Sequence, residues 1–100
     1  MTEPSSTPSP TPLPRFAGKV AIITGSSDRG IGGATALRMA EEGASLVLAS
    51  RHQPERLLKK LTRGNYPHVF LQADITIRED IERIVAAGRE RFGKLDILVN

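Results

Sequence analysis

Short apolar runs alternate with segments of helical periodicity from Lys19 to Asn100, and this alternation limits the fold more than any other feature. The runs predict four strands, and they read "KVAIIT", "SLVLAS", "HVFLQA" and "LDILVN" (residues 19–24, 45–50, 68–73 and 95–100). The segments between them predict helices over about residues 31–42, 54–63 and 76–92. A helix between each pair of successive strands favours parallel strands joined by right-handed crossovers. The sequence therefore predicts an α/β fold with the order βαβαβαβ.

Local signals indicate where the helices start and which faces they bury. Pro54 suits the first turn of the second helix, where a backbone N–H has no helical acceptor in any case. Thr76 and Glu79 have the S/T-x-x-E spacing of a capping box, which predicts that the third helix starts beside them. The expected apolar stripes are Ile31, Ala34, Leu37, Met39 and Ala40 in the first helix, and Ile77, Ile81, Ile84, Val85 and Gly88 in the third.

The stretch "TGSSDRGIGG" (Thr24–Gly33) follows the first apolar run directly and contains four glycines in ten residues. In a parallel α/β sheet, the carboxyl end of a strand and the start of the next helix form an anion site. Glycines allow backbone N–H groups to approach a pyrophosphate closely, and the helix dipole favours its charge. The stretch predicts a nucleotide-phosphate loop, with a purely structural glycine-rich turn as the alternative.

Three separated segments carry a resemblance to a known family. "VAIITGSSDRGIGGATALRMAEEGA", "QADIT" and "RFGKLDILVN" resemble the N-terminal part of the short-chain dehydrogenase/reductase family, and within it the 3-oxoacyl-carrier-protein reductase-like members. The resemblance covers the chain from about Phe16 to Asn100. It implies the N-terminal half of a Rossmann-type doubly wound parallel sheet, with strand order 3-2-1-4, that binds a nicotinamide dinucleotide.

The resemblance also implies which residues bind the cofactor. Asp74, with Ile75, matches the acidic position that hydrogen-bonds the adenine amino group, and Asn100 matches an Asn near the adenosine ribose. The alternatives are that Asp74 caps the turn into the following helix and that Asn100 is a structural residue at a strand end. The residues that match the family's T-G-x-x-x-G-[IL]-G loop, beside the phosphates and the nicotinamide, are Thr24, Gly25, Gly30, Ile31 and Gly32.

The glycine-rich loop departs from the family pattern by one residue. Four residues, Ser26 to Arg29, separate Gly25 from Gly30, where the family has three. Asp28 brings a negative charge near the expected phosphates, and we expect it to bulge outward and pair with an arginine. The longer loop leaves open whether Ser26 or Ser27 faces the cofactor, and Ser27 is the residue we assign.

The end of the second predicted strand indicates which cofactor is preferred. An acidic residue there would bind the ribose hydroxyls of NAD and repel a 2′-phosphate. This chain instead has Ser50 followed by Arg51, whose guanidinium suits a 2′-phosphate. Arg29, just before Gly30, lies where NADP-preferring relatives often carry a base. We therefore expect NADP(H) rather than NAD(H), with ordinary solvated arginines as the alternative.

No catalytic residue is assigned. In this family the Tyr of a Y-x-x-x-K motif transfers the proton, with the help of its Lys and of a Ser. The sole tyrosine, Tyr66, has Phe70 four residues later and lies just before a predicted strand. We expect the cofactor-binding half of an NADP(H)-dependent oxidoreductase for a carbonyl or alcohol substrate, truncated at Asn100 and homo-oligomeric at full length. A non-catalytic NADP(H)-sensing protein is the alternative.

Residues 1–14, "MTEPSSTPSPTPLP", lack the apolar side chains that a core requires. We expect a disordered Pro-, Ser- and Thr-rich tail followed by a single nucleotide-binding domain over residues 15–100. The tail has no apolar core of a secretory signal and is not an Arg-rich transit peptide. A weaker alternative is that "TPSPTPLP" docks to a groove of the SH3 or WW kind.

Composition excludes several classes of function. The chain has no cysteine, which excludes disulfides, thiolate metal sites and a Cys nucleophile. Its net charge of +3 and its scattered basic residues argue against nucleic-acid binding. His52 and His68 are too isolated to predict a metal site, and no apolar run is long enough to span a membrane. We expect a soluble, cytoplasmic protein whose half sheet exposes apolar surface and an open edge.

Overall fold

The computed structural model of the chain describes residues 15–25 and 31–99. The order βαβαβαβ is confirmed, while the predicted tail and part of the glycine-rich loop lie outside the described residues. The described strands and helices are β1 (Val20–Thr24), α1 (Ile31–Glu41), β2 (Ser45–Ser50), α2 (Glu55–Arg63), β3 (His68–Gln72), α3 (Arg78–Phe92) and β4 (Ile97–Val99).

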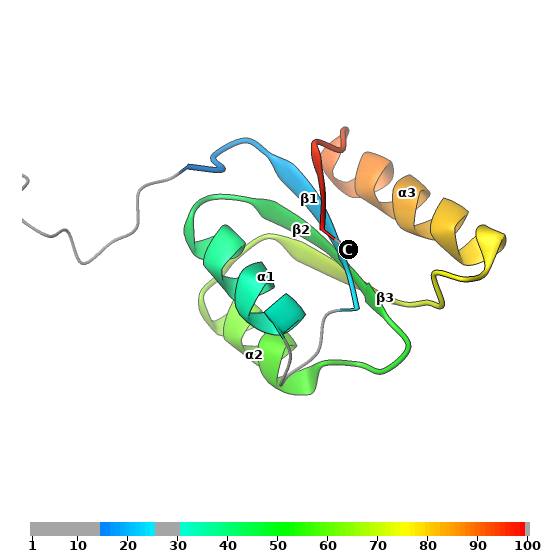
Figure 1. The fold of residues 1–100 in the computed structure, drawn as a ribbon. Coiled ribbons are helices and arrows are strands. Elements are labelled where there is room, and N and C mark those ends of the chain that lie inside the picture. The colour runs from blue at the N-terminus through cyan, green and yellow to red at the C-terminus, as the bar shows by residue number, and fades with distance from the viewer. Residues whose placement is uncertain (1–14, 26–30, 100) are drawn as a thin grey trace, which may run out of the picture.

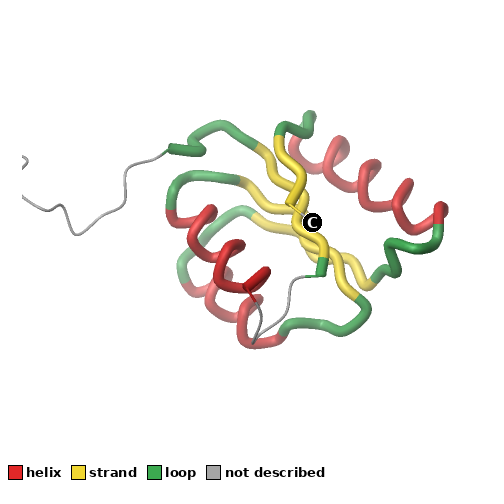
Figure 2. The backbone as a smooth tube through the Cα atoms, in the orientation of Figure 1, coloured by secondary structure: helices red, strands yellow, loops and turns green. Residues whose placement is uncertain are grey.

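The four described strands form one parallel sheet with the order β3-β2-β1-β4, as predicted. Helices α1 and α2 cover one face of the sheet and α3 covers the other, so the architecture is doubly wound (Figure 1). Figure 2 shows the strands lying side by side between the two helical layers. Because every pair is parallel, the carboxyl ends of all four strands lie at one edge.

The core on the α1 and α2 face comes from alternate strand residues and two helices. Side chains of β1 and β2 that point to this face are fully buried, because helices lie directly over the two central strands. The first helix contributes Ala36, which the expected stripe omitted, whereas Ala34 is exposed. The buried cluster comprises Ala21, Ile23, Ala36, Met39, Ala40, Ala44, Leu46, Leu48, Leu57 and Leu61.

The core on the α3 face is smaller and depends on a close approach of α3 to the sheet. Its buried members are Val20, Ile22, Val47, Ala49, Ala73 and Ile84. Gly88 of α3 is buried, and a Cβ at that position would lie 2.4 Å from Leu95 Cδ2 and 3.2 Å from Val47 Cγ2. The missing side chain therefore sets the distance between helix and sheet.

The start of α3 differs from the prediction. The capping residue of the helix is Ile77, which has no capping side chain, so the predicted Thr76–Glu79 capping box is wrong. The reason is a competing local contact, since the Thr76 hydroxyl donates its hydrogen bond to Asp74 Oδ1 instead. The predicted apolar stripe is also only partly buried: Ile84 and Gly88 are buried, whereas Ile77 and Ile81 are each 45% exposed.

The outer edge of the described sheet is apolar. Strand β4 is shorter than expected, and Leu98 at its centre is 69% exposed. A groove of about 480 Å³ runs between β4 and α3, lined by Ile22, Thr24, Ile75, Ile81, Ile84, Val85, Leu95, Asp96, Ile97 and Leu98. Within the described residues, no helix has the length and apolar character that a membrane crossing requires.

We expect the substitution Gly88→Leu to lower the free energy of unfolding by about 1–3 kcal/mol, because the added side chain overpacks the contact with Leu95 and Val47. Leucine is a good helix former, so any loss must come from packing. Urea denaturation measures the change. The control is Ala86→Leu at an exposed position of the same helix, for which we expect little change. Equal stabilities for the two variants would contradict the close approach.

Candidate functional site

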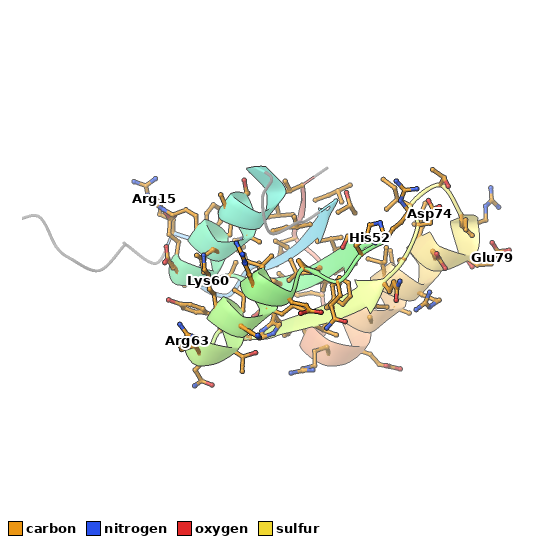
Figure 3. All side chains as sticks on the ribbon, turned by 90° about the horizontal axis from the view of Figure 1, so that it is seen from below. Arg15, His52, Lys60, Arg63, Asp74 and Glu79 are labelled. Carbon is orange, nitrogen blue, oxygen red and sulfur yellow. The ribbon has the colours of Figure 1, made fainter. Side chains whose placement is uncertain are left out.

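A pocket of about 350 Å³ lies at the carboxyl ends of β1, β2 and β3. Five of the residues predicted to bind a cofactor meet there, although they are far apart in the sequence. Figure 3 shows His52 and Asp74 together at this end of the sheet, opposite to the end that carries Arg15. The pocket is lined by the predicted residues Gly25, Ser50, Arg51, Asp74 and Ile75, and also by Ala49, Ala73 and Thr76.

Backbone hydrogen bonds hold the floor of the pocket. The Gly25 N–H donates to the Ala49 carbonyl at 3.0 Å, and the Ala73 N–H donates to the Ser50 carbonyl at 2.9 Å. Parallel pairing thus continues one residue beyond the ends of β1 and β3. Gly25 has a φ of +69° with open space around it, so its left-handed backbone, and not crowding, requires glycine. The chain leaves the sheet at this residue.

Polar contacts fix the segment that follows β2. The Ser50 hydroxyl donates to the His52 carbonyl, and the Gln72 side-chain amide donates to the Arg51 carbonyl at 2.9 Å. These contacts hold the backbone of Arg51, while its side chain remains exposed. The Arg51 guanidinium forms no salt bridge with any described residue, so a cation is presented at the rim of the pocket.

Asp74 shapes the turn between β3 and α3. Its Oδ1 accepts hydrogen bonds from the Thr76 N–H at 2.9 Å and from the Thr76 hydroxyl at 2.6 Å. The hydroxyl contact, then the N–H contact, and then the charge of Arg51 lower the pKa of Asp74 below its usual value. The residue is therefore a carboxylate at neutral pH. The alternative predicted for Asp74, a structural role in this turn, applies to Oδ1.

The rest of this turn leaves one acceptor and one donor for a ligand. Within the described part of the chain, Asp74 Oδ2 accepts no hydrogen bond and the Ile75 N–H donates none. The two groups belong to adjacent residues in the pocket lining. An acceptor beside a donor is complementary to the amino group and ring nitrogen at one edge of adenine.

The remaining predicted residues fall in three places. Thr24 is half-buried, and its hydroxyl donates to the Val99 carbonyl at 3.4 Å, so it lines the groove beside β4 and not this pocket. Ile31 and Gly32 form the first turn of α1. The other four predictions, Ser27, Arg29, Gly30 and Asn100, lie outside the described residues and stay predictions.

Three pocket residues were missed by sequence reasoning. Ala49 and Ala73 are small, buried residues near strand ends, which leave room at the carboxyl edge. Thr76 was interpreted as part of a helix cap. The sequence signal for its contact with Asp74 is the D-x-T spacing of residues 74–76, which is typical of a turn that starts at an Asp.

Other candidate chemistry lies away from the pocket. Tyr66 precedes β3 at the opposite edge of the sheet and packs against the α1 and α2 core. The described residues contain no group of three His, Asp or Glu side chains that could hold a metal ion. The polar groups of the strand-end pocket are therefore the best candidate for ligand recognition in the described part of the chain.

A parallel doubly wound sheet with a pocket at the carboxyl ends of its strands defines an α/β protein of the kind that binds its ligand at this edge. The family model of the short chain dehydrogenases matches residues 19–100. The chain therefore belongs to the short-chain dehydrogenase family, whose members use a nicotinamide dinucleotide cofactor. The predicted resemblance to the family is confirmed, while the 3-oxoacyl-carrier-protein reductase subtype stays a prediction.

Several curated relatives are similar over most of this chain. Glucose 1-dehydrogenase of Gluconobacter oxydans is 42% identical over 90 residues, which cover 85% of this chain and 33% of that protein. The 1,6-dihydroxycyclohexa-2,4-diene-1-carboxylate dehydrogenase of Pseudomonas putida is 44% identical over 86 residues, which cover 86% of this chain and 32% of that protein. This chain spans about a third of the length of these relatives.

Solved structures support the same fold. A hydroxysteroid dehydrogenase from Escherichia coli matches with a TM-score of 0.79 and 30% identity, over 87% of this chain and 37% of that chain. A 7α-hydroxysteroid dehydrogenase in complex with NADH and 7-oxoglycochenodeoxycholic acid matches with a TM-score of 0.79 and 30% identity, over 87% of this chain and 34% of that chain.

We expect Thr76→Val to raise the pKa of Asp74, because the largest cause of its lowering is the Thr76 hydroxyl. A carboxyl group whose pKa is lowered by folding stabilises the fold above its ordinary pKa and loses that contribution as the pH falls through the lowered value. Thr76→Val should therefore reduce the acid dependence of stability. A ¹³C NMR titration of the Asp74 carboxyl measures the shift, with Thr76→Ser, which keeps the hydroxyl, as control. An unchanged titration in Thr76→Val would contradict the assignment.

Proposed function

We propose that this chain is the dinucleotide-binding part of an NADP(H)-dependent oxidoreductase that acts on a carbonyl or alcohol substrate. The observation that carries the proposal is the convergence of Gly25, Arg51 and Asp74 in one pocket at the carboxyl ends of three parallel strands. Ligands of open α/β sheets bind at this edge. The chain's own residues supply binding and orientation, and the nicotinamide supplies the hydride when it is bound.

The adenine is recognised by the turn after β3. Asp74 Oδ2 accepts a hydrogen bond from the exocyclic amino group, and the Ile75 N–H donates to the adjacent ring nitrogen. Because Asp74 is ionised at neutral pH, its hydrogen bond to the amino group is charge-assisted. Thr76 holds the other oxygen, so the free oxygen has a defined direction.

The 2′-phosphate of NADP(H) is recognised at the end of β2. Arg51 offers a planar, forked cation, and Ser50 adds a hydroxyl beside it. The pocket lining contains one carboxylate, Asp74, which lies in the turn after β3, so no acid at the end of β2 repels the phosphate. Arg29, which lies outside the described residues, is the second proposed phosphate ligand.

The pyrophosphate lies between the end of β1 and the start of α1. Gly25 lets the main chain turn sharply at the sheet edge, and Ile31 and Gly32 form the first turn of the helix, whose free N–H groups and dipole favour an anion. In the sequence, the proposed loop residues Ser27 and Gly30 come between Gly25 and Ile31, outside the described residues. Thr24 is proposed to border the phosphate and nicotinamide side, and Asn100, which lies outside the described residues, is proposed to lie near the adenosine ribose.

The substrate class follows from the names of the relatives. The matched dehydrogenases are named for glucose, L-fucose, a dihydroxycyclohexadiene carboxylate and hydroxysteroids. All of these names refer to compounds that carry hydroxyl groups. A dehydrogenase that acts on a hydroxyl group forms a carbonyl group. We propose the same class of substrate, and a homo-oligomeric state, for this protein.

We expect Arg51→Asp to change cofactor preference from NADPH to NADH. The substitution removes a charge-assisted contact to the 2′-phosphate and adds a carboxylate that can bind the ribose hydroxyls. Loss of one such contact should weaken NADPH binding about tenfold or more, with little loss for NADH. Fluorescence titration of the purified chain with both cofactors measures the ratio.

The matched control for this experiment is Arg56→Asp. It makes the same charge change on the exposed face of α2, outside the pocket lining, so it reports the general electrostatic effect. We expect it to leave the NADPH to NADH ratio nearly unchanged. The proposal for Arg51 fails if both variants keep the wild-type ratio, and the proposed function fails if the wild-type chain binds neither cofactor.

A further inference from the structure

We propose that Asp80 is a positioning residue for adenine recognition, which holds the Ala73–Asp74 peptide and thereby the backbone orientation of Asp74, the residue that carries the acceptor for the base. This inference rests on the proposed function, since it concerns the same pocket. Asp80 does not line the pocket and lies in the first turn of α3. It therefore acts through Asp74, and not by contact with the ligand.

The Asp80 carboxylate connects two elements of the structure. Its Oδ2 accepts a hydrogen bond from the Asp74 N–H at 2.8 Å, and its Oδ1 accepts one from Arg83 Nη1 at 3.0 Å. Its own N–H donates to the Ile77 carbonyl at 3.1 Å, which fixes the residue in the helix. With one oxygen used on each side, the carboxylate has a fixed orientation between the turn and α3.

The connection bears on recognition because of what Asp74 and Ile75 present. The acceptor Oδ2 is on the side chain of Asp74, and the donor N–H of Ile75 is in the peptide that follows the same Cα. The backbone orientation of Asp74 therefore sets both groups at once. Three sets of hydrogen bonds hold the turn. Thr76 donates to Asp74 Oδ1, the Ile77 N–H donates to the Asp74 carbonyl at 3.0 Å, and the Asp74 N–H donates to Asp80. Of these, only the contact from Asp80 comes from the side chain of a helix.

The location of Asp80 makes this contact strong. Its side chain is 20% exposed, against 54% for Arg83, so the acceptor is shielded more than its partner. The first turn of a helix stabilises a carboxylate through the helix dipole. If the acceptor were removed, the Asp74 N–H would lose its partner in a half-buried site. The Ala73–Asp74 peptide would then be free to rotate toward solvent, and the backbone of Asp74 would move with it.

The test measures discrimination between two bases. Deamino-NADPH carries hypoxanthine, which has a carbonyl oxygen in place of the amino group and a protonated ring nitrogen, so its donor and acceptor are reversed. The affinity ratio of NADPH to deamino-NADPH therefore reports how Asp74 Oδ2 and the Ile75 N–H are oriented. A purely structural loss would weaken both ligands equally and leave the ratio unchanged.

We expect Asp80→Ala to weaken NADPH binding about tenfold, with little change for deamino-NADPH, so that the ratio falls toward one. Asp80→Asn keeps an acceptor oxygen for the Asp74 N–H and should restore most of the ratio. Glu79→Ala is the matched control: it removes the same charge from the same turn of α3, at an exposed residue seen in Figure 3, and should leave the ratio unchanged. Titration of the purified full chain gives all the affinities.

Each outcome has one interpretation. If wild-type chain fails to prefer NADPH over deamino-NADPH, the adenine contacts of the proposed function are wrong, and this inference fails with them. If wild-type chain discriminates and Asp80→Ala discriminates equally, this inference alone is overturned. If Asp80→Ala does not fold, Asp80→Leu removes the same acceptor while a side chain of similar shape fills the space, and an unchanged ratio in that variant overturns the inference.

Discussion

The site depends on the parallel register of β2 with its two neighbours. Thr24 of β1 pairs with Ala49, and Gln72 of β3 pairs with Ser50, so three strands end within one residue of each other. Hydrogen bonds from Gly25 and Ala73 extend this pairing past the strand ends. A shift of one residue in either pair would displace Arg51 from Asp74 and turn the side chains of that strand to the opposite face. The pocket is thus a consequence of the register.

That register is enforced by burial on both faces of the sheet. Leu46 and Leu48 point toward α1 and α2, while Val47 and Ala49 point toward α3, and all four are fully buried. A slipped strand would exchange these two sets and mismatch their volumes against different helices. Because α3 contacts the sheet closely at Gly88, the face toward α3 has little room for larger side chains. Core packing therefore supports the polar contacts at the sheet edge, although none of its members touches the pocket except Ala49 and Ala73.

Periodicity in the sequence was sufficient to predict the elements and their order, because buried parallel strands and amphipathic helices have different apolar spacing. The range of β2 agrees with the prediction at both ends. Ser50, Arg51 and Asp74 were expected at the ends of their strands, and parallel pairing brings these ends to one edge of the sheet. The prediction failed at the start of α3, where two hydrogen-bond partners compete for one side chain. Thr76 fits a capping box by spacing, yet its hydroxyl contacts Asp74, and only the geometry of the turn decides between the two partners. No sequence pattern indicates the hydrogen bond from Gln72 to the Arg51 carbonyl or the one from the Asp74 N–H to Asp80.

The two interpretations of Asp74, structural residue or ligand residue, are compatible because its carboxylate has two oxygens. Oδ1 accepts from Thr76 and defines the turn, which leaves Oδ2 directed by the same contact. A carboxylate that served the ligand alone would lose side-chain entropy on binding, whereas this one is already ordered by the fold. Its lowered pKa reflects the same arrangement, since the contacts that order the group also favour its charge. Local structure and the proposed recognition of adenine are therefore coupled at this residue: a substitution that loosens the turn also misaligns the acceptor.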